Sequence, residues 1–320
     1  MQTGFARAAL GLTIGLTFAP WLNVRADQGG VPFWLSGQYA SLAALPATPG
    51  WSLAVLPYYY NGSASRSRTF QIGGTASAGL EANSPLMLLR PSYTPDAKIL
   101  GGQLSLALVV GVARNNSAVD LTVSPANVGR GKSDSTSGGT DLYPSASLAW
   151  NSGKHNWMTY LTGDIPTGAY DKNRLANIGI GHGAIDAGGG YTYLDQKTGR
   201  ELSAVAGLTY NFQNNDTHYK NGIDSHLDWA ASQFLSASWQ IGVAGYVYYQ
   251  LTGDGGSGNL VGSFKSRVAA AGPEVGYLFK LMGNQAYVNA RAYKEFWAKN
   301  RVEGYTLFAT LSISFGRGEK

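Results

Sequence analysis

The chain has 320 residues and a formal net charge of +5, with 44% hydrophobic residues, only 13% charged residues and no cysteine. The missing cysteines exclude disulfides, iron–sulfur clusters, thiolate zinc sites and a lipoprotein anchor, and the lack of a dense Lys/Arg stripe excludes a nucleic-acid partner. A mean hydropathy of -0.11 excludes a helical membrane protein. The 43 Gly, 19 Tyr and few charges are instead typical of a transmembrane β-barrel.

Residues 1–26 have the pattern of a secretory signal peptide. Arg7 supplies the positive start, residues 8–19 are apolar, and small residues precede a predicted cut after Ala26. A transmembrane anchor is the weaker interpretation, because a spanning helix needs about 20 apolar residues and Pro20 interrupts this run. We therefore predict that the chain is exported across the inner membrane and that the mature protein begins at residue 27.

Residues 27–50 differ from the rest of the chain. They are small and apolar, show no two-residue period, and are interrupted by Pro32, Pro46 and Pro49. We expect this segment to form a plug in the lumen of the barrel, with a short periplasmic segment as the alternative.

Residues 51–320 are predicted to form an antiparallel transmembrane barrel, because alternating runs separated by turn residues follow one another to the end. We expect about fourteen strands, with twelve as the alternative, since single-chain bacterial barrels have even numbers. The expected strands are 51–60, 68–80, 84–94, 99–113, 116–124, 141–151, 155–163, 182–194, 199–213, 224–236, 239–252, 264–279, 285–297 and 302–315.

The expected connections divide into short and long ones. If the first strand rises from the periplasm, short turns such as 81–83 and 114–115 fall on the periplasmic side. The outer side receives long polar loops, namely 125–140, 164–181, 214–223 and 253–263. Short periplasmic turns and long outer loops are typical of outer-membrane barrels.

The last run shows the alternation most clearly. Tyr305, Leu307 and the apolar residues up to Phe315 alternate with Thr306, Phe308 and mostly hydroxyl residues. Successive side chains of a strand point to opposite faces, so one face suits lipid and the other suits the lumen. We expect this strand to pair with 51–60 and close the barrel.

Prolines fall inside four expected strands, at Pro57, Pro91, Pro144 and Pro273. Proline removes a ladder donor, so each should mark a kink, a bulge or an opening in the wall. A face switch at Pro273 would also explain why Arg267 shares a register with apolar residues.

The sequence predicts no enzyme, metal or cofactor. His226 and Asp228 share a face of one strand, which general acid–base catalysis would require, but a polar lumen wall is the favoured interpretation. Oxygen-rich stretches at 214–216 and 254–256 could bind calcium, although ordinary solvated loops are favoured there.

Charged residues within the strands are expected to face the interior, because a charge at the bilayer midplane costs about 2–4 kcal/mol on a barrel. Two interpretations stay open: the charges neutralise a filled lumen, or they line a solute path. The residues are Asp186, Asp228, Lys265, Arg267, Glu274, Arg291 and Glu295.

Several segments resemble a known family. They include PFWLSGQYASLAA at 32–44, LGGQL at 100–104, TGDIPTGAY at 162–170, NIGIGH at 177–182, YNFQNNDTHYKNGID at 210–224 and AGPEVGY at 271–277. The chain is similar to the outer-membrane proteins named for the meta pathway of phenol degradation, which are distantly FadL-like. The resemblance implies passage of hydrophobic or aromatic compounds and a lumen plug, and it supplies no catalytic residues.

We therefore predict an outer-membrane channel for passive uptake of small hydrophobic or aromatic compounds, with a structural or adhesive barrel as the alternative. A lateral exit near a kinked strand would spare an apolar solute a water-filled pore. The expected partners are outer-membrane lipid, the solute and the barrel-insertion machinery. The expected solute-path residues are Phe33, Trp34, Tyr39, His182, Asp186, Asp228, Arg267 and Arg291.

Overall fold

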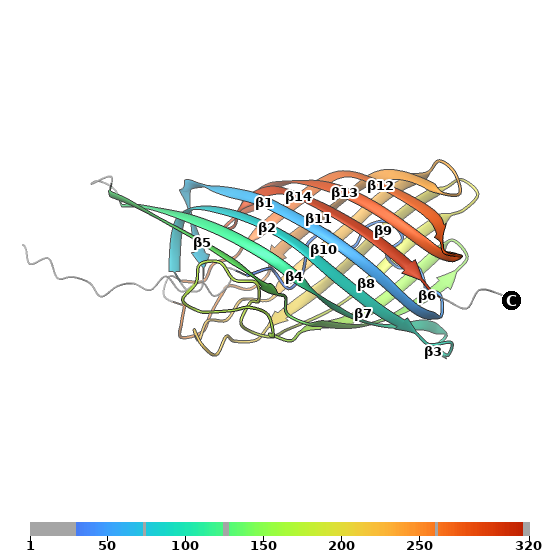
Figure 1. Ribbon diagram of the computed structural model, residues 1–320, viewed down its shortest axis with the longest axis horizontal. Helices are drawn as coiled ribbons and strands as arrows, with labels where there is room; N and C mark the ends of the chain where they lie inside the picture. Colours follow the sequence, from blue (N-terminus) through green and yellow to red (C-terminus); the bar gives the residue numbers. More distant parts are fainter. Residues whose placement is uncertain (1–29, 73–74, 124–127, 260–261, 316–320) are drawn as a thin grey trace, which may run out of the picture.

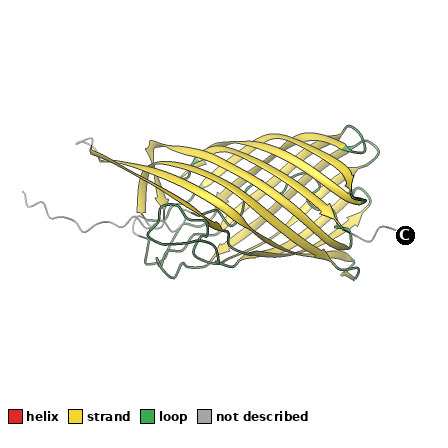
Figure 2. Ribbon diagram, viewed as in Figure 1, coloured by secondary structure: helices red, strands yellow, loops and turns green. Residues whose placement is uncertain are grey.

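The computed structural model describes residues 30–72, 75–123, 128–259 and 262–315. The predicted signal peptide, residues 1–26, lies outside these ranges. Within them the regular structure is β-sheet (Figure 2), and no helix is long and apolar enough to cross a membrane.

Twelve of the described strands close into one antiparallel barrel (Figure 1). Closure is achieved by β14, which pairs with β13 and also with β1, from Ser52↔Ser314 to Ser63↔Glu303. The strands of the ring are β1 (Gly50–Ile72), β2 (Thr75–Thr94), β4 (Gly102–Val123), β6 (Tyr143–Ser152), β7 (His155–Asp164), β8 (Ala184–Asp195), β9 (Arg200–Asn211), β10 (Asp224–Phe234), β11 (Trp239–Gln250), β12 (Arg267–Leu281), β13 (Asn284–Lys299) and β14 (Glu303–Ser314).

Two further strands stand outside the ring. The short β3 (Lys98–Ile99) pairs with the beginning of β4, and β5 (Val128–Gly139) pairs with the far half of β4. The predicted antiparallel barrel is confirmed, and its closed wall has the alternative number of twelve strands rather than about fourteen.

The predicted turns at 81–83 and 114–115 are wrong. Both stretches lie inside the long strands β2 and β4. The expected strands 99–113 and 116–124 form the single strand β4, and the expected strand 68–80 is divided between β1 and β2. The polar residues that suggested turns make cross-strand bonds instead: Asn83 Nδ2 donates to the Tyr59 hydroxyl at 2.6 Å, and Ser84 Oγ donates to Asn115 Oδ1 at 2.7 Å.

The expected outer loop at 125–140 is also wrong, because β5 occupies most of it. The sequence of β5 is polar and has no apolar face. Its twelve residues pair with the second half of β4, after the part of β4 that pairs with β6. A strand that extends past the lipid needs no alternation of apolar and polar residues, so periodicity does not identify it.

The two faces of the wall sort as the alternation predicts. Leu202 and Leu208 of β9 are 54% and 53% exposed, whereas Ser203 between them is buried. In β14, Leu307 is half exposed and Phe308 is buried. The exposed apolar face is the one a lipid bilayer covers, and the buried face lines the interior.

Prolines interrupt the strand ladder without shifting its register. The β1–β14 pairing passes from Val55↔Leu311 to Tyr58↔Phe308 and omits Pro57, and the β12–β13 pairing similarly omits Pro273. The shift in the β12–β13 pairing lies where Arg267 and Ala269 face Lys299 and Phe296, so β13 carries the extra residue. β12 pairs with β11 without a shift, so the expected face switch at Pro273 is wrong.

The connections separate by length, as predicted. Short ones at 153–154, 196–199, 235–238 and 282–283 gather at the end where β14 finishes, and the long loops 165–183, 212–223 and 251–266 lie at the opposite end (Figure 1). By the rule that outer loops are the long ones, the latter is the outer end.

Candidate functional site

The segment 30–49 runs through the interior of the barrel (Figure 1). At the outer end, the backbone N–H of Val31 donates to the carbonyl of Ile178 at 3.0 Å. Near the short-turn end, the N–H of Ala44 donates to Thr192 Oγ1 at 3.0 Å, and the chain then enters β1 at Gly50. The segment therefore spans most of the length of the barrel.

Three buried carboxylates of the wall hold this segment by its backbone. Each belongs to a different strand, and each accepts hydrogen bonds from consecutive parts of the segment. The donors are Gly37 N (2.9 Å) and Tyr39 N (3.1 Å) to Asp228, Ser41 N (3.3 Å) and Ser41 Oγ (2.9 Å) to Glu274, and Leu42 N (2.9 Å) to Glu201. Bonds to an ionised acceptor are the stronger kind, so this wall fixes a segment that has no regular structure.

Gly37 lets the segment approach the wall closely. Its φ is 80°, in the left-handed region that favours glycine. A side chain there would meet the rings of Tyr246 and Tyr293, and the Tyr293 hydroxyl donates to the Gly37 carbonyl at 3.1 Å. No larger residue fits this position.

Trp34 anchors the segment to a second polar cluster. Its ring stacks on His226 at 3.5 Å between centroids, and His226 Nε2 lies 2.9 Å from Asp186 Oδ2. The Tyr160 hydroxyl donates to the other oxygen of Asp186 at 2.7 Å. His226 thus acts with Asp186 rather than with Asp228, as part of a polar wall beneath an aromatic ring.

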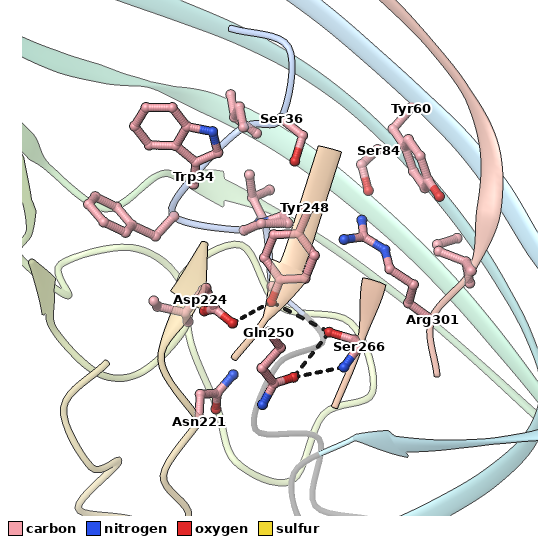
Figure 3. A pocket seen from close by; sticks show the side chains of 18 of the residues that line it. Trp34, Ser36, Tyr60, Ser84, Asn221, Asp224, Tyr248, Gln250, Ser266 and Arg301 are labelled. Atoms are coloured by element: carbon pink, nitrogen blue, oxygen red, sulfur yellow. Dashed lines mark hydrogen bonds between the residues drawn. The ribbon is translucent and has the colours of Figure 1, made fainter. Parts of the chain in front are cut away.

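An outer cavity of about 290 Å³ lies between the segment and the long loops. Figure 3 shows Trp34 and Ser36 of the segment on one side of it and the tyrosines of the wall on the other. The Tyr248 hydroxyl donates to Asp224 at 2.6 Å, and the guanidinium of Arg301 lies over the Tyr248 ring at 5.0 Å. The lining is aromatic and amphipathic.

An inner cavity of about 260 Å³ lies between the segment and β1, β2, β4, β6, β7 and β14. The strands whose carboxylates bind the segment, β9, β10 and β12, are on the opposite side of the barrel. The inner cavity therefore lies along the strands to which the segment is not bonded. Of the segment, Val31, Phe33, Trp34 and Leu35 line both cavities, as does Leu86 of β2. These four residues separate the outer cavity from the inner one.

Most of the predicted path residues come together around this segment. Phe33 and Trp34 lie between the cavities. Asp186 contacts His226 and Tyr160, and Asp228 accepts hydrogen bonds from the segment. The Tyr39 ring lies 6.0 Å from that of Tyr160. Arg291 donates to the carbonyl of Gln38 at 3.4 Å and lies over the Phe308 ring at 4.4 Å.

His182 was expected on a strand of the wall and lies in a loop instead. It precedes β8, is buried, and its Nδ1 lies 3.0 Å from the Gly183 carbonyl. Burial lowers the pKa of His182, and the nearby Asp141 opposes that shift. Its position among the outer loops makes it part of the packing of residues 165–183 rather than of the interior wall.

Arg267 was expected in the lumen and faces outward. It pairs with Tyr249, whose side chain is exposed, and its guanidinium lies over the Trp297 ring at 4.3 Å. Arg267 has the same parity as the exposed Val275 in a strand whose pairing with β11 runs without a shift. It therefore lies on the outer face, where an arginine stacked on an interfacial tryptophan is tolerated. Lys265 is also outside the interior, and its Nζ donates to the Leu251 carbonyl in the loops at 2.6 Å.

Several interior residues escaped the sequence analysis. Arg90, Glu201 and Arg301 all face cavities or the segment. Arg90 could have been found, because it continues the inward series of Leu86 and Leu88, which are buried while Met87 and Leu89 are exposed. Glu201 lies in the expected strand 199–213 but only its contact with the segment shows its role.

A closed barrel of antiparallel strands with an apolar outer face and a polar, partly filled interior defines a bacterial outer-membrane β-barrel protein. Residues 65–311 match the family described as "Putative MetA-pathway of phenol degradation". The match spans more than half of the chain, which therefore belongs to this family.

A solved structure shares the fold. The structure of an outer membrane channel from Pseudomonas putida F1 aligns with 14% identity and a TM-score of 0.64, over 85% of this chain and 97% of that one. A FadL homologue from Pseudomonas aeruginosa aligns with 8% identity and a TM-score of 0.42, over 82% and 89%, a likeness too distant to bear on function. A comparison with curated proteins found no match.

Proposed function

We propose that the protein is an outer-membrane channel for passive uptake of small hydrophobic or aromatic compounds, and that residues 27–50 are the plug of its lumen. The observation that supports this most is the pair of aromatic-lined cavities that meet at Val31, Phe33, Trp34 and Leu35. Solute enters the outer cavity, passes Phe33 and Trp34, and reaches the inner cavity beside the bonded part of the segment.

The lining supplies the driving force for capture. Burial of apolar surface contributes about 25 cal/mol per Å² removed from water, and the tyrosine, phenylalanine and tryptophan rings of both cavities offer such surface. The family description and the name of the Pseudomonas putida F1 protein, an outer membrane channel, agree with this class of function.

The exit proposed here is lateral. The inner cavity reaches Leu56 of β1 and Phe308 of β14, beside the point where Pro57 leaves the ladder between these strands unpaired. An apolar solute that leaves there moves from one apolar surrounding to another and is not rehydrated. A Pro57→Val variant, which restores the donor, should slow release into lipid.

Two experiments test the channel. A strain that lacks the protein should grow more slowly on a limiting aromatic carbon source, and the deletion of residues 27–49 should change permeation in proteoliposomes. Resistance of the folded barrel to SDS without heating confirms that the deletion variant has folded. Unchanged growth together with unchanged permeation would refute transport and favour a structural or adhesive barrel.

A further inference from the structure

The charged side chains of the interior differ in whether they have hydrogen-bond or ion-pair partners. Asp228, Glu274 and Glu201 accept hydrogen bonds from the segment, and Glu295 accepts from two tyrosine hydroxyls. Arg90, by contrast, makes no hydrogen bond or ion pair with any residue that the structure describes. A guanidinium without an acceptor in the membrane-spanning wall is costly, so its surroundings should supply one.

Arg90 gives the inner cavity its charge. Arg90 is the one charged residue among the described residues that line this cavity. The other lining residues are apolar, aromatic or hydroxyl-bearing, apart from the amide of Gln38. The outer cavity differs, because Asp224, Asp254 and Glu295 line it beside Arg301. Asp164 at the end of β7, whose carboxylate makes no hydrogen bond with a described residue, does not line the inner cavity. The inner cavity is therefore an apolar space with one free cationic group.

One further group favours an anion there. It is not Arg291, which stacks on Phe308 but stands across from Glu274 in the ladder and acts on that carboxylate. The hydroxyl of Tyr143, another lining residue, is buried without a hydrogen-bond partner. The Phe33 ring lies 5.9 Å from that of Tyr143, and together they give the cavity an aromatic side.

We propose that the inner cavity binds an aromatic monocarboxylate. The carboxylate lies on Arg90, whose planar fork matches two carboxylate oxygens. The ring lies against the leucines of β2 and the rings of Phe33 and Phe308. The site deepens the proposed function, because the bound anion occupies the inner half of the proposed solute path, but binding itself requires no transport.

Calorimetric titration of the full mature protein in detergent micelles tests the site directly. Benzoate is the probe, benzyl alcohol is its uncharged counterpart, and hexanoate carries the same charge without a ring. We expect benzoate to bind about 10-fold to 100-fold more tightly than benzyl alcohol, the range that a charge-assisted hydrogen bond supplies. Hexanoate should bind more weakly than benzoate.

Variants of Arg90 assign the effect. Arg90→Gln should reduce benzoate binding to the level of benzyl alcohol, and Arg90→Lys, which keeps the charge but loses the fork, should bind with intermediate affinity. Arg200→Gln removes an exposed arginine from the end of β9 and should leave binding unchanged. If Arg90→Gln does not fold, the benzoate affinity of Arg90→Lys and the comparison of benzoate with benzyl alcohol still test the proposed site.

The proposal is overturned by absent benzoate binding, by equal affinities for benzoate and benzyl alcohol, by hexanoate affinity equal to that for benzoate, or by wild-type affinity in Arg90→Gln. Flux of neutral phenol into proteoliposomes is measured separately. Arg90-dependent binding without phenol flux would preserve the site and refute the channel, and phenol flux without benzoate binding would do the reverse.

Discussion

At the scale of single residues, the wall carboxylates decide where the segment lies, and Asp228 is the clearest case. Its two oxygens accept separate N–H bonds from Gly37 and Tyr39. Asp228→Asn replaces one acceptor by an amide that itself donates, so one N–H loses its partner. With about 1.5–3 kcal/mol for a bond to a charged group, we expect hydrogen exchange at residues 37–39 to accelerate at least tenfold.

Exchange is measured by mass spectrometry on the protein in micelles. Asp216→Asn, at an exposed acid in the outer loops, is the matched control and should change nothing at residues 37–39. Unchanged exchange in Asp228→Asn would mean that the segment is held by its other bonds alone.

Trp34 carries the second prediction at this scale. Its ring lines both cavities and is buried, so Trp34→Ala opens a connection between them. We expect faster permeation of a neutral aromatic solute into proteoliposomes and a larger single-channel conductance. Trp157→Ala removes an exposed ring from the outer face of β7 and should leave permeation at the wild-type rate. A folded Trp34→Ala protein with wild-type permeation would show that solute does not pass this residue.

Side-chain parity explains which residues the sequence could place. Asp186 and Asp228 lie in strands whose alternation is unbroken, so their inward direction follows from that of their neighbours. Arg267 also lies in a strand of unbroken alternation, with the same parity as the exposed Val275, so parity gives it an outward direction. Charge alone predicted a lumen position for Arg267, and the backbone geometry decided otherwise.

At the scale of elements, the sequence predicted most strand boundaries but not the contacts of the segment 30–49. Strand boundaries followed from alternation wherever lipid covers the outer face. They failed in the long strands β1, β2 and β4 and in β5, where the chain extends past the other strands. The segment 30–49 has no period, so its lack of pattern predicted an irregular piece. Its partners among twelve strands depend on tertiary contacts that no local pattern encodes.

The segment should stay in place while solute passes. Its backbone bonds lie on the side of β8, β9, β10 and β12, whereas the inner cavity lies on the opposite side. The chain has no native cysteine, so a disulfide between Ala43→Cys and Ser203→Cys, where N and Oγ are 3.4 Å apart, can tether it cleanly. We expect the same permeation for the oxidised and the reduced double variant.

A gel shift that reverses on reduction confirms the tether, and the two single-cysteine variants are the controls. Permeation that falls on oxidation and recovers on reduction would show that the segment must leave the wall for solute to pass.

At the scale of the whole molecule, the alternation of apolar and polar residues along the strands explains why the barrel resides in the outer membrane. An apolar outer face and a closed ladder suit lipid, and most of the interior charges are paired or face cavities. Composition and periodicity were enough to predict this much, because the bilayer imposes the same rule on every strand. The content of the lumen obeys no such rule, and only contacts between distant parts of the chain define it.

Maturation supplies the last prediction. A retained apolar leader would hold the chain at the inner membrane, whereas the barrel requires the outer one, so we predict that residues 1–26 are removed. Mass spectrometry of protein from outer membranes should show a chain that begins at Asp27. Ala26→Arg places a large charged residue at the cut and should accumulate an uncleaved precursor in the inner-membrane fraction, whereas Gln28→Arg, beyond the cut, should mature normally. Full-length chain recovered from the outer membrane would contradict the assignment, because the leader would then belong to the mature protein.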